Sequence, residues 1–160
     1  MLKEFTHCAF SVGASLYLLS RMHLLSAASF IAGIWLSFSV NLLIDVLGHT
    51  RTGVPSRTRL THSVFTAPLW GASTGYASYL VVSQILSLQT SPNLVLWVSA
   101  GVLTSLGHLF LDSMTQAGVY SWNRRMAVAH FKYDNPALNA GFVLTGVALS
   151  AMAILQLAFS

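Results

Sequence analysis

Two acidic residues lie inside long apolar segments, and each has a histidine four positions away. The pairs are Asp45 with His49 and His108 with Asp112. Residues four apart share one face of a helix, so each carboxylate would stand beside an imidazole. Ionisable side chains are costly inside a membrane segment and usually serve a function there, so this spacing predicts metal ligands. An ion pair at a helix end is the simpler alternative for each pair.

The chain carries more candidate ligands than one metal centre needs. Imidazole and carboxylate suit zinc, iron and manganese, and a catalytic centre needs about three protein ligands plus an open position for water. The excess predicts either two metals, or one metal whose histidines are oriented by further polar residues. We expect a divalent metal, zinc first, with manganese and iron as alternatives. The predicted ligands are His7, Asp45, His49, His62, His108 and Asp112.

Three of these ligands are also predicted to be catalytic, namely Asp45, His62 and Asp112. A bound metal lowers the pKa of its water to near neutrality, and one carboxylate could then act as general base. Two arginines before His62 could hold a phosphate or another anion by bidentate hydrogen bonds, and two asparagines would share a helix face near the site. The candidate substrate-binding residues are therefore Arg57, Arg59, Asn135 and Asn139.

The elements that position these residues are membrane helices. Of the 160 residues, 54% are hydrophobic and 8% are charged, and the mean hydropathy is +0.66. A soluble domain has about 25% charged residues, so this chain cannot cover a soluble surface. A spanning helix needs about 20 residues. The apolar segments run from about Phe5 to Ser20, Leu24 to Gly48, His62 to Leu88, Leu94 to Thr115 and Pro136 to Phe159. The expected fold class is an all-α polytopic bundle of about five transmembrane helices, forming one domain over residues 1–160.

The basic residues predict how this bundle is oriented. Lys and Arg favour cytoplasmic loops. If the five segments cross in turn, seven of the eight basic residues fall on the side of the N-terminus, and Arg21 falls on the other. This predicts a multi-pass protein of the cytoplasmic (inner) membrane with its N-terminus in and its C-terminus out. Every candidate ligand then lies at the cytoplasmic face, and His23 alone among the histidines lies at the opposite face.

Other functional signatures are absent. The sequence has no P-loop, no G-x-G-x-x-G, no G-x-S-x-G and no H-E-x-x-H. The net charge of +4 is accounted for by the basic loops, so we expect no nucleic-acid partner. Gly71 and Gly75 form a G-x-x-x-G, which indicates close helix packing within or between chains and leaves a homo-oligomer open.

Three sequence elements resemble a known family. They are Thr6-His7, then Arg59-Leu60-Thr61-His62-Ser63, and then the run from Gly107 to Val119, which contains His108-x-x-x-Asp112-x-x-Thr115-x-x-Gly118-Val119. In this order they resemble the YdjM-like family, described as LexA-binding, inner-membrane-associated, metal-dependent hydrolases that are suggested to act on phospholipids. The resemblance covers about residues 6 to 120.

The resemblance implies that His62, His108 and Asp112 are metal or catalytic residues, with His7 as their partner. The family commonly has an Asp-x-Asp-His run after its second segment, where this chain has one carboxylate and a longer gap, from Asp45 to His49. The stretch from Tyr133 to Asn139 has no counterpart in the family pattern.

The function predicted from these observations is a membrane-embedded metal-dependent hydrolase at the cytoplasmic face. Its substrate would be a phospholipid or another lipid phosphoester, because a site at headgroup depth meets such bonds directly. Membrane lipid would thus be both environment and substrate. Two alternatives use the same residues: a metal-ion or proton transporter, and a non-catalytic structural membrane protein. The outer halves of the segments contain no comparable chain of acids, which argues against a transport pathway.

Overall fold

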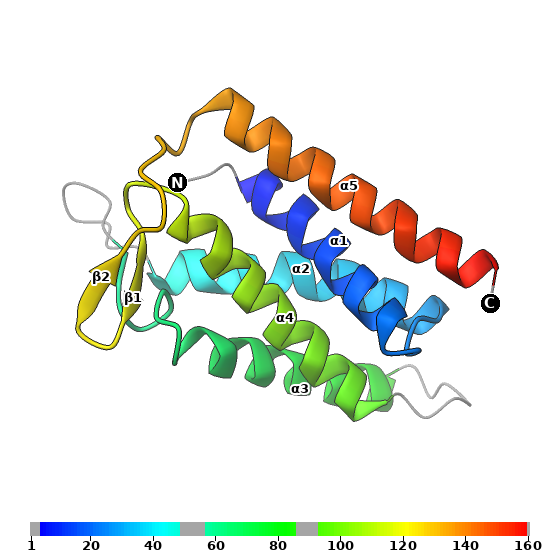
Figure 1. Ribbon diagram of the computed structural model, residues 1–160. Coiled ribbons are helices and arrows are strands. Elements are labelled where there is room, and N and C mark those ends of the chain that lie inside the picture. Colours follow the sequence, from blue (N-terminus) through cyan, green and yellow to red (C-terminus); the bar gives the residue numbers. More distant parts are fainter. Residues whose placement is uncertain (1–3, 49–56, 86–92, 160) are drawn as a thin grey trace.

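The computed structural model describes residues 4–48, 57–85 and 93–159 (Figure 1). These residues form five helices and one short β-hairpin, joined by turns and loops. The elements are α1 (Glu4–Arg21), α2 (Ala27–Gly48), α3 (Ala67–Ile85), α4 (Leu94–Ser113), β1 (Val119–Ser121), β2 (Arg124–Met126) and α5 (Pro136–Ala158).

The predicted all-α helical bundle is confirmed, and the five helices follow the five apolar segments. Three of them are long and apolar enough to cross a membrane: Phe30–Gly48 within α2, Leu94–Ser113 and Pro136–Ala158. α1 and α3 contain more small and polar residues, among them several Ser, Thr and Gly. The expected start of the third helix was wrong. Its first residue is Ala67, so His62 lies in the turns that precede the helix.

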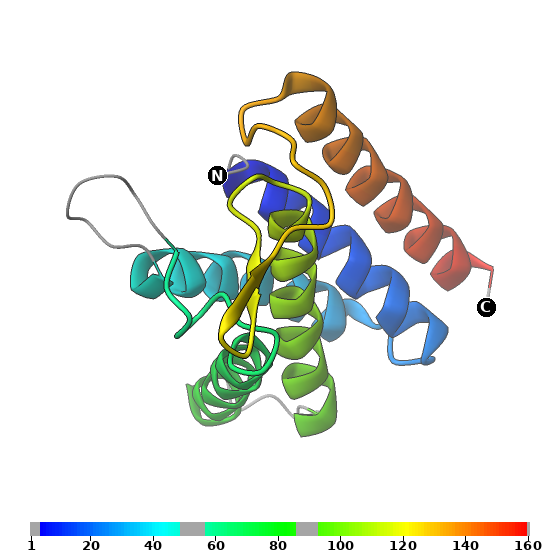
Figure 2. The same cartoon turned by 60° about the vertical axis from the view of Figure 1, so that its left-hand side comes forward.

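α4 is the central helix of the bundle. It packs against α1, α2 and α3, while α5 lies along α1 on the outside (Figures 1 and 2). Glycines bring α3 and α4 into backbone contact. A Cβ on Gly71 or Gly101 would collide with the main-chain carbonyl of the other residue, which sits on the facing helix. The G-x-x-x-G of α3 is therefore used within the chain, against α4.

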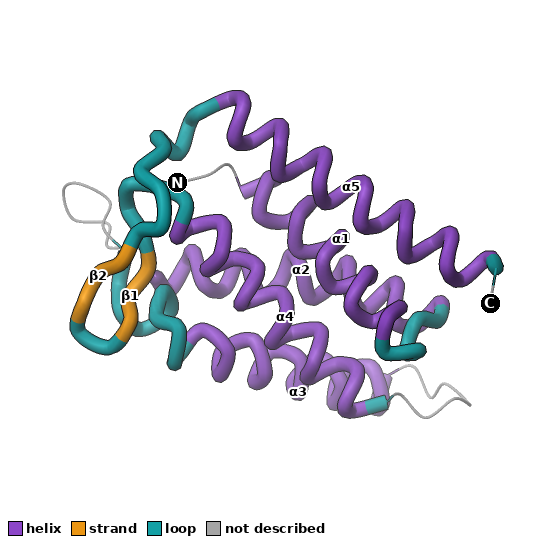
Figure 3. Tube along the Cα trace, viewed as in Figure 1, coloured by secondary structure: helices purple, strands orange, loops and turns teal. Residues whose placement is uncertain are grey.

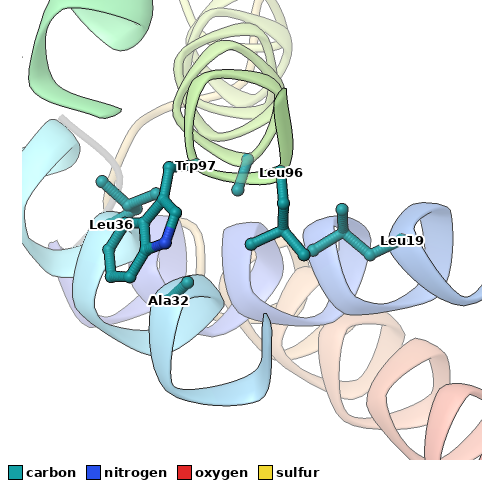
Figure 4. Close-up of a cluster of buried hydrophobic side chains, with 6 residues drawn as sticks. Leu19, Ala32, Leu36, Leu96 and Trp97 are labelled. Carbon is teal, nitrogen blue, oxygen red and sulfur yellow. The ribbon is translucent and has the colours of Figure 1, made fainter. Parts of the chain in front are cut away.

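An apolar core fills the bundle at the end away from the hairpin. The side chains buried there come from three helices: Leu19 of α1, Ala32 and Leu36 of α2, and Leu96 and Trp97 of α4 (Figure 4). Burial of one such large side chain stabilises the fold by about 1.5–3 kcal/mol. This core fixes the spacing of α1, α2 and α4, the three helices that carry most of the candidate ligands.

The β-hairpin was not predicted from the sequence. β1 and β2 are three residues each and pair antiparallel at the end of the bundle where α2 and α4 end (Figure 3). The main-chain N–H of Tyr120 donates to the carbonyl of His62 at 2.8 Å, and that of Val64 donates to the carbonyl of Tyr120 at 3.0 Å. The hairpin therefore holds the turn segment that carries His62.

Candidate metal centre

Five of the six predicted ligands meet at this same end of the bundle. His7 is in the first turn of α1, Asp45 is in the last turn of α2, and His62 precedes α3. His108 and Asp112 occupy the end of α4, one turn apart. The sixth predicted ligand, His49, lies outside the described residues.

Four side-chain atoms surround one point between α2 and α4. His108 Nε2 is 3.3 Å from Asp112 Oδ2 and 3.6 Å from Asp45 Oδ1. His62 Nε2 is 3.4 Å and 3.9 Å from the same two oxygens. Ligands at about 2.1 Å from a tetrahedral ion are about 3.4 Å apart. These four separations are therefore in the range of neighbouring ligands on one divalent ion, and Asp45, His62 and His108 form one group of atoms close enough to hold it.

The burial of these atoms also favours a cation. The side chains of His62, His108 and Asp112 are 0–1% exposed. Within the described residues, His108 Nε2 and Asp112 Oδ2 are buried and form no hydrogen bond, although they are 3.3 Å apart. A buried polar atom without a partner costs about 1–3 kcal/mol, and more when it is charged. A cation between the two atoms would satisfy both.

Asn41 sets the tautomer of His108. The Asn41 amide nitrogen donates to the carbonyl of Ser37 at 2.5 Å, which directs its oxygen toward the imidazole. His108 Nδ1 lies 2.7 Å from that oxygen and must donate to it. The proton is thus assigned to Nδ1, and the Nε2 lone pair faces the carboxylates, as a metal ligand requires.

Thr61 does the same for His62. The Thr61 hydroxyl donates to the carbonyl of Ile44 at 3.0 Å, so its oxygen is left to accept. His62 Nδ1 lies 3.0 Å from that oxygen and is assigned as the donor. Two independent contacts therefore present both Nε2 lone pairs to the same point. A buried pair of histidines that only joined helices would not need this arrangement.

Arg57 binds the other side of the Asp112 carboxylate. Its Nη2 donates to Asp112 Oδ1, and its Nη1 donates to the carbonyl of Gly118 at 2.7 Å and to the hydroxyl of Thr115 at 3.3 Å. Burial lowers the pKa of the Arg57 guanidinium, the Asp112 carboxylate opposes that change, and the group stays charged. Arg57, predicted to hold a substrate anion, is thus placed where it anchors Asp112.

His7 completes the cluster from α1. Its ring stacks on His108 with centroids 4.2 Å apart, and its Nε2 lies 3.4 Å from Asp112 Oδ1. His7, His108 and Asp112 form a second group of atoms close enough to bind an ion. Asp112 therefore has one oxygen toward His62 and His108 and the other toward His7 and Arg57.

Arg59, the second arginine predicted to bind an anion, lies in the segment between α2 and α3. Arg59 is exposed, donates to Asn123 Oδ1 at 2.9 Å and lies 5.6 Å from the centroid of the Tyr120 ring. These contacts fix Arg59 to the hairpin.

The two asparagines stabilise the start of α5. Asn135 is the N-cap, and its side chain accepts from the main-chain N–H of Leu138 at 3.0 Å. Asn139 Oδ1 accepts from the Thr6 hydroxyl at 2.7 Å, and its Nδ2 donates to the carbonyl of Tyr133 at 3.0 Å. The second asparagine thereby ties α5 to the first turn of α1, one residue before His7.

Sequence reasoning missed Asn41 and Thr61. A signal existed for each: Asn41 lies four residues before Asp45 in an apolar segment, and Thr61 immediately precedes His62. The roles of Thr115 and Gly118 were also missed, because Arg57, the residue they bind, is about 60 residues away in the chain.

Comparison with known proteins gives a family without an assigned activity. The searches of curated proteins and of solved structures find no match. A family model described as "Protein of unknown function (DUF1286)" matches residues 2–111, which include His7, Asp45, His62 and His108 and end one residue before Asp112. This match covers more than half of the chain, and the chain therefore belongs to the DUF1286 family of proteins of unknown function.

Proposed function

We propose that this protein is a membrane-embedded hydrolase that uses one divalent metal, zinc first, to cleave a lipid phosphoester at the cytoplasmic leaflet. The ligands would be His62, His108 and Asp112, with a fourth position left open beside Asp45. The observation that carries the proposal is the set of four separations of 3.3–3.9 Å between two imidazole nitrogens and two carboxylate oxygens. Two nitrogens and two oxygens in this arrangement suit zinc, with manganese and iron as alternatives.

The contacts of Asp112 support one metal rather than two. A second ion beside His7 would have to share Asp112 Oδ1, and the Arg57 guanidinium already binds that oxygen. Arg57 thus takes the place that a second cation would occupy. Thr115 and the Gly118 carbonyl accept further hydrogen bonds from Arg57 and so satisfy its buried charge. Removing either partner of such a buried ion pair is strongly destabilising.

Asp45 marks the side from which water and substrate would approach. Its side chain is 17% exposed, whereas those of His7, His62, His108 and Asp112 are 0–2% exposed. A metal held by His62, His108 and Asp112 would keep one position open for an activated water and would polarise a phosphoryl oxygen. Asp45, at the open side, is placed to accept the proton of that water as general base. Arg57 and His7, on the closed side, hold Asp112 in position.

A lipid substrate is favoured by the depth of the cluster. Asp45 lies in the last turn of α2 and His108 and Asp112 lie at the end of α4, and both helices are apolar enough to span a membrane. The end of such a span is at the level of the lipid headgroups. The resemblance to a hydrolase family suggested to act on phospholipids points to the same substrate class.

The proposed orientation is N-terminus in and C-terminus out, from the distribution of Lys and Arg. In a variant without Cys8, a cysteine at position 160 should react with an impermeant thiol reagent from outside the cell, and one at position 55 only after permeabilisation. The reverse labelling would move the metal centre to the outer face.

Activity in liposomes tests the proposed reaction. Protein reconstituted with zinc and phospholipid should release a phosphorylated headgroup or a phosphate, and His62→Ala should lower the rate at least about 100-fold. His23→Ala is the matched control, because His23 lies near Arg21 at the other end of α1, and it should stay near the wild-type rate. Full activity in a folded His62→Ala protein would overturn the proposal.

One observation favours transport as a second candidate. Buried polar side chains continue from His108 along the inside of the bundle: Asn41 donates to Ser11 at 3.4 Å, and Ser15 bonds to Thr104 at 3.3 Å. Among the described residues, this row of polar side chains contains no acid that could carry a cation or proton further, which favours hydrolysis over transport. Liposomes loaded with a metal-sensitive dye discriminate the two, since uptake of zinc without release of phosphate would identify a transporter.

A further inference from the structure

An apolar groove lies between α2 and α3, away from the hairpin. Its volume is about 480 Å³, and almost all of its lining surface is apolar. Ile31 and Trp35 of α2 form one side, Ala77 and Val81 of α3 form the other, and Trp97 of α4 is part of the wall. None of these residues belongs to the metal centre.

The packing of the bundle keeps this groove open. Gly71 and Gly101 draw α3 onto α4, and α3 packs less extensively against α2. Between α2 and α3, Trp35 Nε1 donates to the Ser78 hydroxyl at 3.1 Å. Trp97 is 4% exposed and packs with Ala32 and Leu36 in the core, which makes the wall rigid (Figure 4). The groove is therefore a preformed feature and does not need a rearrangement to accept a ligand.

A stripe of exposed apolar side chains connects the groove with the open side of the metal centre. The stripe follows one face of α2 at helical spacing and leads to Asp45. Its side chains are 54–65% exposed and belong to Ile31, Trp35, Phe38 and Leu42. From Trp35 to Asp45 the rise is about 15 Å, at about 1.5 Å per residue. This equals one leaflet, since the hydrocarbon core is about 30 Å thick.

We propose that the groove binds one acyl chain of the lipid whose headgroup is presented to Asp45. This inference rests on the proposed function, because it assigns the headgroup of the same lipid to the metal centre. Three features support a lipid chain as the occupant: the groove is apolar, it lies at hydrocarbon depth, and it is one leaflet away from Asp45 at the open side of the metal centre. Access would be lateral, from the membrane along α2.

Photo-cross-linking tests the groove without relying on activity. The protein is reconstituted in vesicles of phosphatidylglycerol that carry a diazirine near the end of one acyl chain, and adducts are mapped by mass spectrometry. We expect adducts to concentrate on the groove residues of α2 and α3. Ala77→Trp, and separately Val81→Trp, should fill the groove and lower these adducts at least about fourfold, the loss expected for displacing one methylene group.

Ala148→Trp is the matched control, because Ala148 is also an exposed helical alanine but lies on α5. It should leave the groove adducts unchanged. Adducts spread evenly over α5 and α2, with no effect of either groove substitution, would overturn the inference. Cross-links between two protein chains at the groove would overturn it as well, by making this face an interface between copies.

A metal-site variant separates this inference from the proposed function. His108→Ala with Asp112→Ala should still show groove adducts, because neither residue lines the groove. If the wild type shows these adducts but binds no metal, the groove stands and the hydrolase proposal fails. If the wild type binds metal but shows no groove adducts, the proposed metal centre stands and the acyl-chain inference fails.

Discussion

Replacing Asn41 with leucine should weaken metal binding although Asn41 is not a ligand. The Asn41 oxygen accepts from His108 Nδ1 at 2.7 Å and thereby directs the Nε2 lone pair toward Asp45 and Asp112. Losing such an outer partner typically lowers metal affinity about 10–100-fold, which corresponds to about 1.4–2.8 kcal/mol. Leucine is similar in size, so the packing of the site changes little.

The same substitution should also destabilise the metal-free protein. It leaves a buried N–H of His108 without its acceptor, at a cost of about 1–3 kcal/mol. The two effects are separated by measuring zinc affinity against a competing chelator and thermal unfolding in the presence of excess chelator. Asn41→Asp is the control for affinity: it keeps an oxygen facing His108 Nδ1 although it loses the donor to the Ser37 carbonyl, so it should bind zinc more tightly than Asn41→Leu.

If folded Asn41→Leu binds zinc as tightly as wild type, Asn41 does not orient a ligand, and the tautomer assigned to His108 has no bearing on metal binding.

Three further substitutions test the surroundings of the centre. Thr61→Val should lower zinc affinity about 10–100-fold by removing the acceptor for His62, and Thr61→Ser should restore it; equal affinities would contradict the role. Gly48→Ala should have a similar effect, because its methyl group would overlap the His62 ring; a chelator titration equal to wild type would show that the ring can move at no cost. Gly101→Val should lower the free energy of unfolding by about 1–3 kcal/mol, since it forces α4 away from Gly71, and an unchanged melting temperature would disprove this contact.

The helices and the deepest ligands could be predicted from local sequence. Each helix is a long apolar segment, and His108 and Asp112 are one turn apart in such a segment, so both the element and the shared face follow from spacing. Asp45 could be predicted in the same way, because it is an acid in an apolar segment with a histidine four positions later. The sequence also indicated that these ligands lie at one end of the bundle.

The remaining parts of the site depend on contacts between distant segments. Arg57 was expected to bind a substrate, but it binds Asp112, 55 residues later, and no local pattern encodes that pairing. The hairpin was missed because β1 and β2 are only three residues long and β2 begins with two arginines. His62 was assigned to a helix because apolar residues follow it. Hydrogen bonds between this segment and Tyr120 instead hold it in a turn before the helix.

The metal content of the purified protein shows whether this cluster of histidines and aspartates binds metal. Protein prepared without chelator and reconstituted with zinc should contain about one ion per chain by elemental analysis, the number that the ligands around one point can hold. His108→Ala with Asp112→Ala should lose most of it, and His23→Ala should retain it. About two ions per chain would contradict the role of Arg57 as the second cation. A folded wild-type protein that binds no zinc, manganese or iron would contradict the metal centre itself.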